Sequence, residues 1–244
     1  MSSPWEPLTW DGTFFGLPVV RLAPQLPAQE LAAALDQLRE SGVRLVYWVL
    51  ERPDEARARS ALAAGALHVD DKTTFHAGVN QVLTATASAP VETRVFEGPA
   101  ERLRPLALAA GARSRFRVDP KVGVERFERL YTLWLEGSLR GELAEVTFVT
   151  GSPDAPTGFV TVGRKQGRAD IGLIAVDPLV RGQGCGKALV RRAAQWAREA
   201  GLERIQVVTQ GENREACALY ERCAFDRESV SPVFHFWLEA EPLR

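Results

Sequence analysis

Cysteine is scarce in this chain: among 244 residues there are three, at positions 185, 217 and 223. An odd, low count fits a reducing compartment better than a disulfide-stabilised fold. No CxxC pair occurs, so the spacing gives no support for a zinc or redox site, and we expect no metal. The three histidines, His68, His76 and His235, lie far apart in the sequence, and we interpret them as structural or surface residues.

Long hydrophobic runs and an excess of one charge are also absent. No stretch approaches the roughly 20 apolar residues that a membrane helix requires. The first 20 residues contain no Lys or Arg, so we expect no secretory signal. Thirty Lys and Arg residues balance 31 Asp and Glu residues, which gives a formal net charge of −1 and argues against a nucleic-acid binder. We therefore expect a cytoplasmic protein without nucleic-acid or membrane partners.

The composition that is present is that of a folded α/β protein. Hydrophobic residues make up 45% and charged residues 25%, which are ordinary globular values. The length allows one or two domains. The segment from Gly78 to Thr93 is rich in Thr, Ala and Ser, and we interpret it as a linker. The expected domains are thus residues 1–90, a small α/β domain, and residues 91–244, a catalytic domain.

Hydrophobic spacing predicts an alternation of helices and strands. In the first domain it predicts helices over 29–38 and 53–64 and strands over 44–50 and 72–77. In the second it predicts helices over 100–110, 124–139, 184–200 and 213–222, and strands over 142–150, 158–163, 170–176, 204–209 and 232–238. Strands that are joined through helices imply parallel neighbours in a mixed sheet.

Residues 171–189 carry the most informative motif. A strand that ends at Val176 leads through Pro178 into a loop with glycine at 182, 184 and 186, and this loop opens onto a predicted helix. Glycine lets the backbone bend and approach a ligand, and the N–H groups at a helix N-terminus attract anions. The loop therefore predicts a phosphate or pyrophosphate site, to which Arg181 and Lys187 add positive charge.

Other glycine-rich loops fit this motif less well. A Rossmann loop requires G-x-G-x-x-G early in a βαβ unit, whereas this loop is G-x-G-x-G and lies late in the chain. A Walker loop requires Ser or Thr after Gly-Lys, whereas Ala188 follows Lys187. A plain strand-to-helix turn is the structural alternative. The R-G-x-G-x-G pattern resembles the pyrophosphate loop of the acetyl-CoA-dependent N-acetyltransferases of the GNAT superfamily.

Asn213 and Tyr220 form a second candidate pair. They are separated by seven positions, or two helical turns, and so share one helix face. A helix N-cap for Asn213 and core packing for Tyr220 are the structural alternatives. Leu219-Tyr220-Glu221, followed by Ala224-Phe225, resembles the L-Y-E-x-x-G-F pattern of the GNAT superfamily, with Ala in place of Gly.

This resemblance implies a fold and a reaction. The fold would be the α/β GNAT (acyl-CoA N-acyltransferase) fold, a mixed twisted sheet flanked by helices, preceded by a smaller, partial and degenerate GNAT-like unit. The reaction would be direct transfer of an acetyl group from acetyl-CoA to an amine in a ternary complex. In the superfamily the Asn that matches Asn213 contacts the CoA arm, and the Tyr that matches Tyr220 protonates the leaving thiolate. Cys185 and Cys217 are poor candidates for a nucleophile, because no His lies nearby in the motif.

The resemblance also implies how CoA is bound. A backbone N–H near Ile174 or Val176 would stabilise the oxyanion that forms on the thioester. The residues expected at the CoA site are Ile174, Ala175, Val176, Arg181, Gly182, Gln183, Gly184, Cys185, Gly186, Lys187 and Asn213.

Segments outside these motifs resemble the N-acetyltransferases of dTDP-linked amino sugars. These segments are 6–10, 14–16, 114–117 and 208–210, together with Phe127, Tyr131 and Trp134 on one predicted helix. The resemblance implies a small-molecule acceptor, a dTDP-linked 4-amino-4,6-dideoxy sugar.

The same segments supply candidate acceptor contacts. Arg115 and Arg117 would bind a diphosphate, and Phe116, Phe15 or Trp10 would stack on the base or the sugar. Gln210 completes the set of expected acceptor contacts. A solvated helix end for the two arginines and core packing for the aromatic residues are the structural alternatives.

Other functions stay open at this point. The acceptor could be an aminoglycoside, a polyamine, an amino acid or a protein N-terminus, and a non-catalytic CoA-sensing module is the alternative from another class. A polycationic acceptor would favour an acidic cleft, which Arg115 and Arg117 oppose. Glu228 and Asp170 are the candidates for a general base. Both a monomer and a homodimer are compatible with the sequence.

Overall fold

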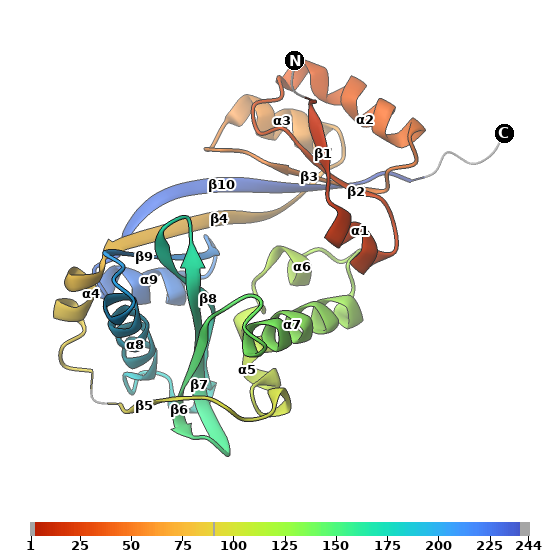
Figure 1. The fold of residues 1–244 in the computed structure, drawn as a ribbon. Coiled ribbons are helices and arrows are strands. Elements are labelled where there is room, and N and C mark those ends of the chain that lie inside the picture. Colours follow the sequence, from red (N-terminus) through yellow and green to blue (C-terminus); the bar gives the residue numbers. More distant parts are fainter. Residues whose placement is uncertain (1–2, 90, 240–244) are drawn as a thin grey trace. The chain divides into compact units, whose positions relative to one another are not determined.

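The computed structural model describes residues 3–89 and 91–239 of the chain (Figure 1). Internal contacts divide it into two compact units. Unit 1 takes in the residues up to Lys72 and those from Ser229 onward, and unit 2 comprises Thr73 to Glu228. Unit 1 is thus built from segments near both ends of the sequence.

Unit 1 is a small sheet with flanking helices. Its strands are neighbours in the order β1, β2, β3 and β10. The β2–β3 pair is parallel, and the other two pairs are antiparallel. The elements are β1 (Trp5–Pro7), α1 (Thr9–Phe15), β2 (Val19–Leu22), the 3-10 turn η1 (Ala28–Glu30), α2 (Leu31–Glu40), β3 (Leu45–Val49), α3 (Glu55–Ala63), the first part of β4 (Leu67–Gly78) and most of β10 (Asp226–Trp237).

Apolar spacing explains the elements of unit 1. In α2, Leu31, Leu35 and Leu38 repeat at helical intervals and are buried. They pack in one core with Trp48 of β3 and Phe236 of β10. The helices and the strand predicted over 29–38, 53–64 and 44–50 are confirmed within a few residues.

Unit 2 is a larger sheet with helices on both faces. Its strands are neighbours in the order β4, β9, β8, β7, β6 and β5. The β8–β9 pair is parallel, whereas β7–β8, β6–β7 and β5–β6 are antiparallel. The elements are α4 (Val79–Ala85), β5 (Thr93–Val95), the 3-10 turn η2 (Ala100–Arg102), α5 (Arg104–Ala110), α6 (Arg115–Val118), α7 (Val124–Leu139), β6 (Val146–Ser152), β7 (Ala155–Lys165), β8 (Arg168–Val176), the 3-10 turn η3 (Pro178–Val180), α8 (Cys185–Glu199), β9 (Arg204–Gln210) and α9 (Arg214–Arg222).

The alternation of side chains along the strands assigns each face of this sheet to different helices. Phe148, Val160 and Ile171 face α8 and pack in one core with α4 and α9. Val149 and Phe159, one residue away in β6 and β7, pack instead against α5 and α7. Figure 1 shows α8 on one side of β7 and β8 and α7 on the other.

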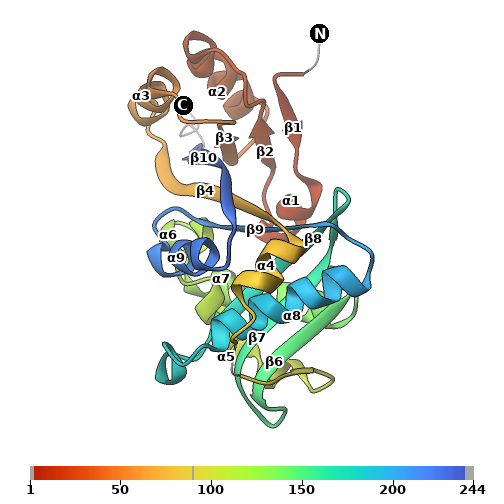
Figure 2. The ribbon, with the colours of Figure 1, turned by 90° about the vertical axis from the view of Figure 1, so that its left-hand side faces the viewer.

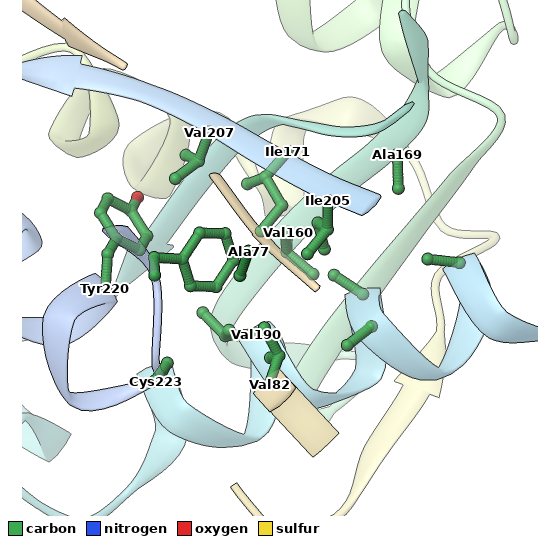
Figure 3. Packing of buried hydrophobic residues seen from close by; sticks show 14 of the residues in the cluster. Ala77, Val82, Val160, Ala169, Ile171, Val190, Ile205, Val207, Tyr220 and Cys223 are labelled. Atoms are coloured by element: carbon green, nitrogen blue, oxygen red, sulfur yellow. The ribbon is translucent and has the colours of Figure 1, made fainter. Parts of the chain in front are cut away.

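Helix α4 belongs to the α8 face. Val79 and Val82 lie in the same core as Val190 and Ala194 of α8, and Arg191 Nη1 donates to the Leu83 carbonyl oxygen at 2.9 Å. Figure 2 shows α4 lying alongside α8, and Figure 3 shows Val82 facing Val190 within the core. The segment 78–93, predicted to be a linker, therefore contains a packed helix and the start of β5.

The order predicted for residues 91–244 was two helices, three strands, then helix, strand, helix and strand. The structure has these elements in this order, but the short strand β5, which was not predicted, precedes them. The short α6 lies between the first two helices. The mixed α/β sheet with helices on both faces is also confirmed. The division at residue 90/91 that we expected differs from the division of the compact units at Lys72/Thr73. The difference arises because α4 packs on α8, and because residues 233–237 of β10 pair with β3.

Within the described residues, no helix has the length and apolar character needed to cross a membrane.

Candidate active site

Strands β8 and β9 pair only over their first halves. Ala169, Asp170 and Ile171 are opposite Ile205, Gln206 and Val207, and the register between the two strands ends there. Beyond this point residues 172–176 of β8 and 208–210 of β9 line a common cavity. A parallel pair that opens at its carboxyl end therefore forms two walls of this cavity.

A β-bulge in β8 stands where the two strands separate. Val160 of β7 is opposite Ile174 and Val162 is opposite Ile171, so Gly172 and Leu173 together face Thr161. The Leu173 N–H donates to Thr161 Oγ1 at 2.8 Å. A Cβ at Gly172 would stand 2.9 Å from the same oxygen, which explains the glycine at this position.

The direction of the backbone N–H groups in β8 follows from two contacts with β7. The Leu173 N–H bonds Thr161 Oγ1, and the Asp177 N–H donates to the Thr157 carbonyl at 2.8 Å. Because N–H groups alternate along a strand, those of Ile174 and Val176 point away from β7, toward the side where β9 has separated. The Val176 carbonyl accepts from Arg181 Nε on that side at 3.3 Å.

The glycine loop forms the third wall of the cavity. Gly182 and Gly184 have φ values of 78° and 89°, a conformation that favours glycine. Gly184 is the N-cap of α8, and the cavity is lined by Gly184, Cys185 and Gly186 at the start of this 15-residue helix. The first N–H groups of a helix have no partner within the helix, so this end of α8 is suited to binding an anion.

Cationic side chains surround the same cavity. Arg113, Arg181, Lys187, Arg214 and Arg222 all contribute to its lining. The carboxylate of Glu215, the acidic side chain in this lining, is paired with Arg181 at 3.3 Å. The lining is therefore strongly positive and suited to ligands that carry several negative charges.

Asn213 is an N-cap, as one of its two interpretations predicted, and it also lies at the cavity. Its side-chain oxygen accepts from the Ala216 N–H at 3.3 Å and caps α9. Asn213 also lines the cavity. Because the oxygen is used as the cap, the amide N–H₂ is the part of this side chain that remains to bind a ligand.

Tyr220 lies at the border between the core and the cavity. Its ring packs against Phe75 and Phe225, with centroid distances of 5.6 and 5.8 Å, while the residue contributes to the cavity lining. Figure 3 shows its hydroxyl directed away from Val82 and Cys223. Burial raises the pKa of the Tyr220 phenol above its usual value, so the hydroxyl remains protonated at neutral pH.

These elements enclose a single cavity of about 960 Å³, at the upper end of the size range of small-molecule sites. The predicted site residues that line it are Ile174, Ala175, Val176, Arg181, Gly182, Gly184, Cys185, Gly186, Lys187, Gln210, Asn213 and Tyr220. Gln183 is exposed and lies outside the lining.

The acceptor contacts expected in α6 also lie outside the lining. Phe116 is buried, with Arg115 over its ring at 4.4 Å and Trp134 at an edge-to-face distance of 5.8 Å. Arg117 lies 5.8 Å from the ring of Phe127. Phe15 is a buried residue of unit 1, in edge-to-face contact with Phe14. The rings of Phe116 and Phe15 therefore pack against neighbouring side chains of their own units. This is the core packing that the sequence analysis gave as the alternative to a contact with the acceptor.

The two candidate bases are engaged elsewhere in the sheet. Glu228 is paired with Arg168 at 2.9 Å, and this contact lowers the pKa of its carboxyl. Asp170 accepts from Gln206 Nε2 at 2.7 Å. Neither residue lines the cavity.

The structure adds cavity residues that the sequence reasoning missed. Ala109, Ala110, Ala112 and Arg113 come from the end of α5 and the loop to α6, and Tyr131 comes from α7. These residues were missed because a few alanines and one arginine near the end of a helix form no recognisable sequence motif. The one available signal was Arg113 itself, a cation two residues after Gly111.

Comparison with known proteins adds to this geometry. The profile of the Acetyltransferase (GNAT) family matches residues 115–225. Among curated proteins, the chain is 28% identical over 237 residues to the dTDP-fucosamine acetyltransferase of Escherichia coli O6:H1, with 96% of each chain covered. It is 38% identical over 78 residues to a mycothiol acetyltransferase of Beutenbergia cavernae, which covers 32% of this chain and 23% of that protein.

Solved structures share the fold at low sequence identity. A functionally unknown conserved protein from Staphylococcus epidermidis superimposes with a TM-score of 0.68 at 11% identity, over 89% of this chain and 84% of that one. A GCN5-related N-acetyltransferase from Sphaerobacter thermophilus has a TM-score of 0.59 at 15% identity, over 96% and 76% of the two chains. A tandem GNAT protein from the clavulanic acid biosynthesis pathway gives 0.57 at 14% identity, over 93% and 77%.

Proposed function

The chain carries an N-acetyltransferase domain of the GNAT family, and we propose that it transfers an acetyl group from acetyl-CoA to the amine of a nucleotide-linked amino sugar. The observation that carries the proposal is the cavity between the separated ends of β8 and β9, which joins the glycine loop to Tyr220.

The residues of the cavity fit CoA. The N-terminus of α8 offers backbone N–H groups where two glycines take positive φ values. Arg181 and Lys187 add positive charge beside it. We assign the pyrophosphate to this loop and the pantetheine arm to the walls formed by residues 172–176 and 208–210. When bound, acetyl-CoA supplies an activated acetyl group on a thioester.

Two groups of the chain then act on the thioester. The N–H groups of Ile174 and Val176 face away from β7 and would stabilise negative charge on the carbonyl oxygen. As the amine nitrogen bonds to the carbonyl carbon and the carbon–sulfur bond breaks, Tyr220, which burial keeps protonated, would donate its proton to the departing sulfur and regain a proton from solvent. Among the described residues that line the cavity, the one carboxylate is that of Glu215, and it is paired with Arg181. The lining therefore offers no free carboxylate as a base, and the acceptor amine would lose its proton to solvent.

The acceptor class rests on two further observations. The relative named dTDP-fucosamine acetyltransferase matches this chain over almost the full length of both proteins. Beyond Arg181 and Lys187, which we assign to CoA, the lining has Arg113, Arg214 and Arg222. These cations favour an anionic acceptor and oppose a polycation such as an aminoglycoside or a polyamine.

Release of CoA from acetyl-CoA with a panel of acceptors tests the proposal. The panel contains dTDP-4-amino-4,6-dideoxyhexoses, an aminoglycoside, spermidine and a peptide with a free N-terminus. We expect turnover with the dTDP sugars alone. Turnover with another amine and none with the sugars would contradict the acceptor and retain the acetyltransferase. Binding of acetyl-CoA without turnover of any member would favour a CoA-sensing module instead.

A further inference from the structure

One wall of the cavity belongs to neither the glycine loop nor the separated strands. It is formed by Ala109 and Ala110 at the end of α5, by Ala112 and Arg113 in the following loop, and by Tyr131 of α7. We call these five residues the α5–α7 wall. The side chains of the three alanines end at Cβ, so Arg113 and Tyr131 carry the polar groups of this wall.

Arg113 has most of its hydrogen-bonding capacity unused. Its Nη1 donates to the Glu212 carbonyl oxygen at 3.4 Å, a long contact with an uncharged partner. Within the described part of the chain it forms no ion pair. By contrast, Arg181 at the glycine loop is paired with Glu215. Arg113 therefore brings an uncompensated positive charge to the cavity.

Tyr131 is fixed in place by a glycine. A Cβ at Gly111 would stand 2.4 Å from Tyr131 Cζ, so the end of the ring occupies the space that a side chain at 111 would fill. Phe127 and Trp134 hold the ring from the other sides, each with a centroid distance of 5.0 Å. Gly111 and Arg113 are in the same short loop, so the fixed ring and the arginine lie on one wall of the cavity.

We infer that Arg113 is a specificity-determining residue that binds an anionic group of the acceptor, and that the anion is a phosphate of the nucleotide-linked sugar. This inference rests on the proposed function. A guanidinium with several free N–H groups suits the paired oxygens of a phosphate. The α5–α7 wall is formed by other elements than the glycine loop, to which we assign the pyrophosphate of the donor, so we assign the cation of this wall to the acceptor.

Steady-state kinetics of Arg113→Gln test the inference. With dTDP-4-amino-4,6-dideoxygalactose as acceptor, we expect the acceptor KM to rise about 10- to 100-fold, as for loss of a hydrogen bond to a charged group. We expect kcat and the KM for acetyl-CoA to change less than about twofold. With the free amino sugar, which lacks the phosphates, the variant and the wild type should have the same KM.

Two further variants serve as controls. Arg113→Lys restores the charge and should recover part of the lost affinity. Arg126→Gln removes an arginine of α7 that, like Arg113, donates to a single carbonyl oxygen, that of Val122 at 3.5 Å, and that lies outside the cavity. This variant should behave as the wild type. An unchanged acceptor KM in Arg113→Gln would overturn the inference, and so would an equal rise in the KM for acetyl-CoA.

A binding experiment separates the inference from the proposed function. Calorimetric titration of dTDP into the protein saturated with CoA needs no turnover. Weaker binding of dTDP to Arg113→Gln than to the wild type supports the inference even if no dTDP sugar is acetylated. Equal binding, or no binding of dTDP to either protein, would overturn it even if an amine is acetylated.

Discussion

At the scale of single residues, Tyr220 combines a buried ring with a hydroxyl at the cavity. We expect Tyr220→Phe to lower kcat at least about 100-fold, because it removes the proposed proton donor and preserves the packing of the ring on Phe75 and Phe225. The dissociation constant for acetyl-CoA, measured by calorimetry, should change less than about twofold.

The matched control is Tyr47→Phe, which removes the hydroxyl of a buried tyrosine in β3 of unit 1. Its kcat should equal that of the wild type. A kcat of Tyr220→Phe within threefold of the wild type would exclude Tyr220 as the acid.

Cys223 gives a residue-scale prediction on stability. Burial raises the pKa of the Cys223 thiol to about 11, above the usual value of 9.0. The folded state therefore holds this proton more tightly than the unfolded chain, so the resulting stability is present below pH 9 and is lost as the pH rises through 11. Urea unfolding should show a decrease in the free energy of unfolding over this interval, on the order of 1–3 kcal/mol from this thiol.

Two variants isolate the contribution of the thiol. In Cys223→Ala the decrease between pH 9 and pH 11 should be smaller than in the wild type. Val190→Ala shortens a side chain of the same core without removing a titratable group, so it should lower stability equally at both pH values. A decrease of equal size in Cys223→Ala and the wild type would show that other groups cause it, such as Tyr220 and Cys217, whose pKa values burial also raises.

The residues that could be predicted from the sequence are those with a spacing rule. Gly182, Gly184, Asn213 and Tyr220 belong to motifs with fixed intervals, and the structure places all of them at one cavity. Arg113 belongs to no such motif. It lines the cavity because α5 and α7 pack on the sheet, which is a tertiary contact that no local pattern encodes.

At the scale of elements, the glycine loop and the far end of α8 allow a matched comparison. Gly182 and Gly201 have φ values of 78° and 72°, and a Cβ at either position would meet nothing within 4 Å. Alanine at either position therefore causes the same kind of backbone strain, of about 1–2 kcal/mol. We expect Gly182→Ala to raise the KM for acetyl-CoA at least about tenfold, because the strain distorts the loop, and Gly201→Ala to leave it unchanged. Equal KM values in the two variants would contradict the assignment of the loop.

The bulge in β8 allows a second comparison. Thr161→Val removes the buried oxygen that accepts the Leu173 N–H, which leaves a donor unpaired in a partly buried part of β8. Chemical unfolding should show a loss of about 1–3 kcal/mol. Thr147 of β6 is also buried, but its hydroxyl has no hydrogen-bond partner among the described residues. Thr147→Val should therefore be neutral or stabilising. A larger loss in Thr147→Val than in Thr161→Val would contradict this account of the bulge.

Elements were predicted well where one sequence pattern sufficed. The helix over 124–139 has the predicted bounds, since its apolar residues repeat over four turns. β1, with three residues, and β2, with four, are too short to show alternation. α4 was missed because it has only seven residues and lies in a segment that was interpreted as a linker from its Thr, Ala and Ser content. Its helix is stabilised by Val79 and Val82 packing on α8.

At the scale of the whole molecule, the two units have separate apolar cores. Trp48, Phe234 and Phe236 lie in the core of unit 1, whereas Phe148, Val160 and Leu189 lie in a core of unit 2. The GNAT profile matches residues 115–225, all of which lie in unit 2. That the first domain is itself a partial GNAT-like unit stays a prediction. β4 and β10 each pass from one unit into the other. Both strands are continuous, so the sequence pattern of residues 67–78 and 226–237 contains no break that could mark the boundary between the units.

The separate cores predict that the units lose structure independently. Phe236→Ala should cost about 3–5 kcal/mol, because it opens a cavity in the core of unit 1. Hydrogen exchange followed by mass spectrometry should then show faster exchange in β2 and β3, with the protection of α8 retained. Phe148→Ala should show the reverse, with faster exchange in β6 and α8. Equal loss of protection in both units, in either variant, would mean that the two cores unfold as one cooperative structure. In that case β4 and β10, which continue through both units, would transmit the instability from one core to the other.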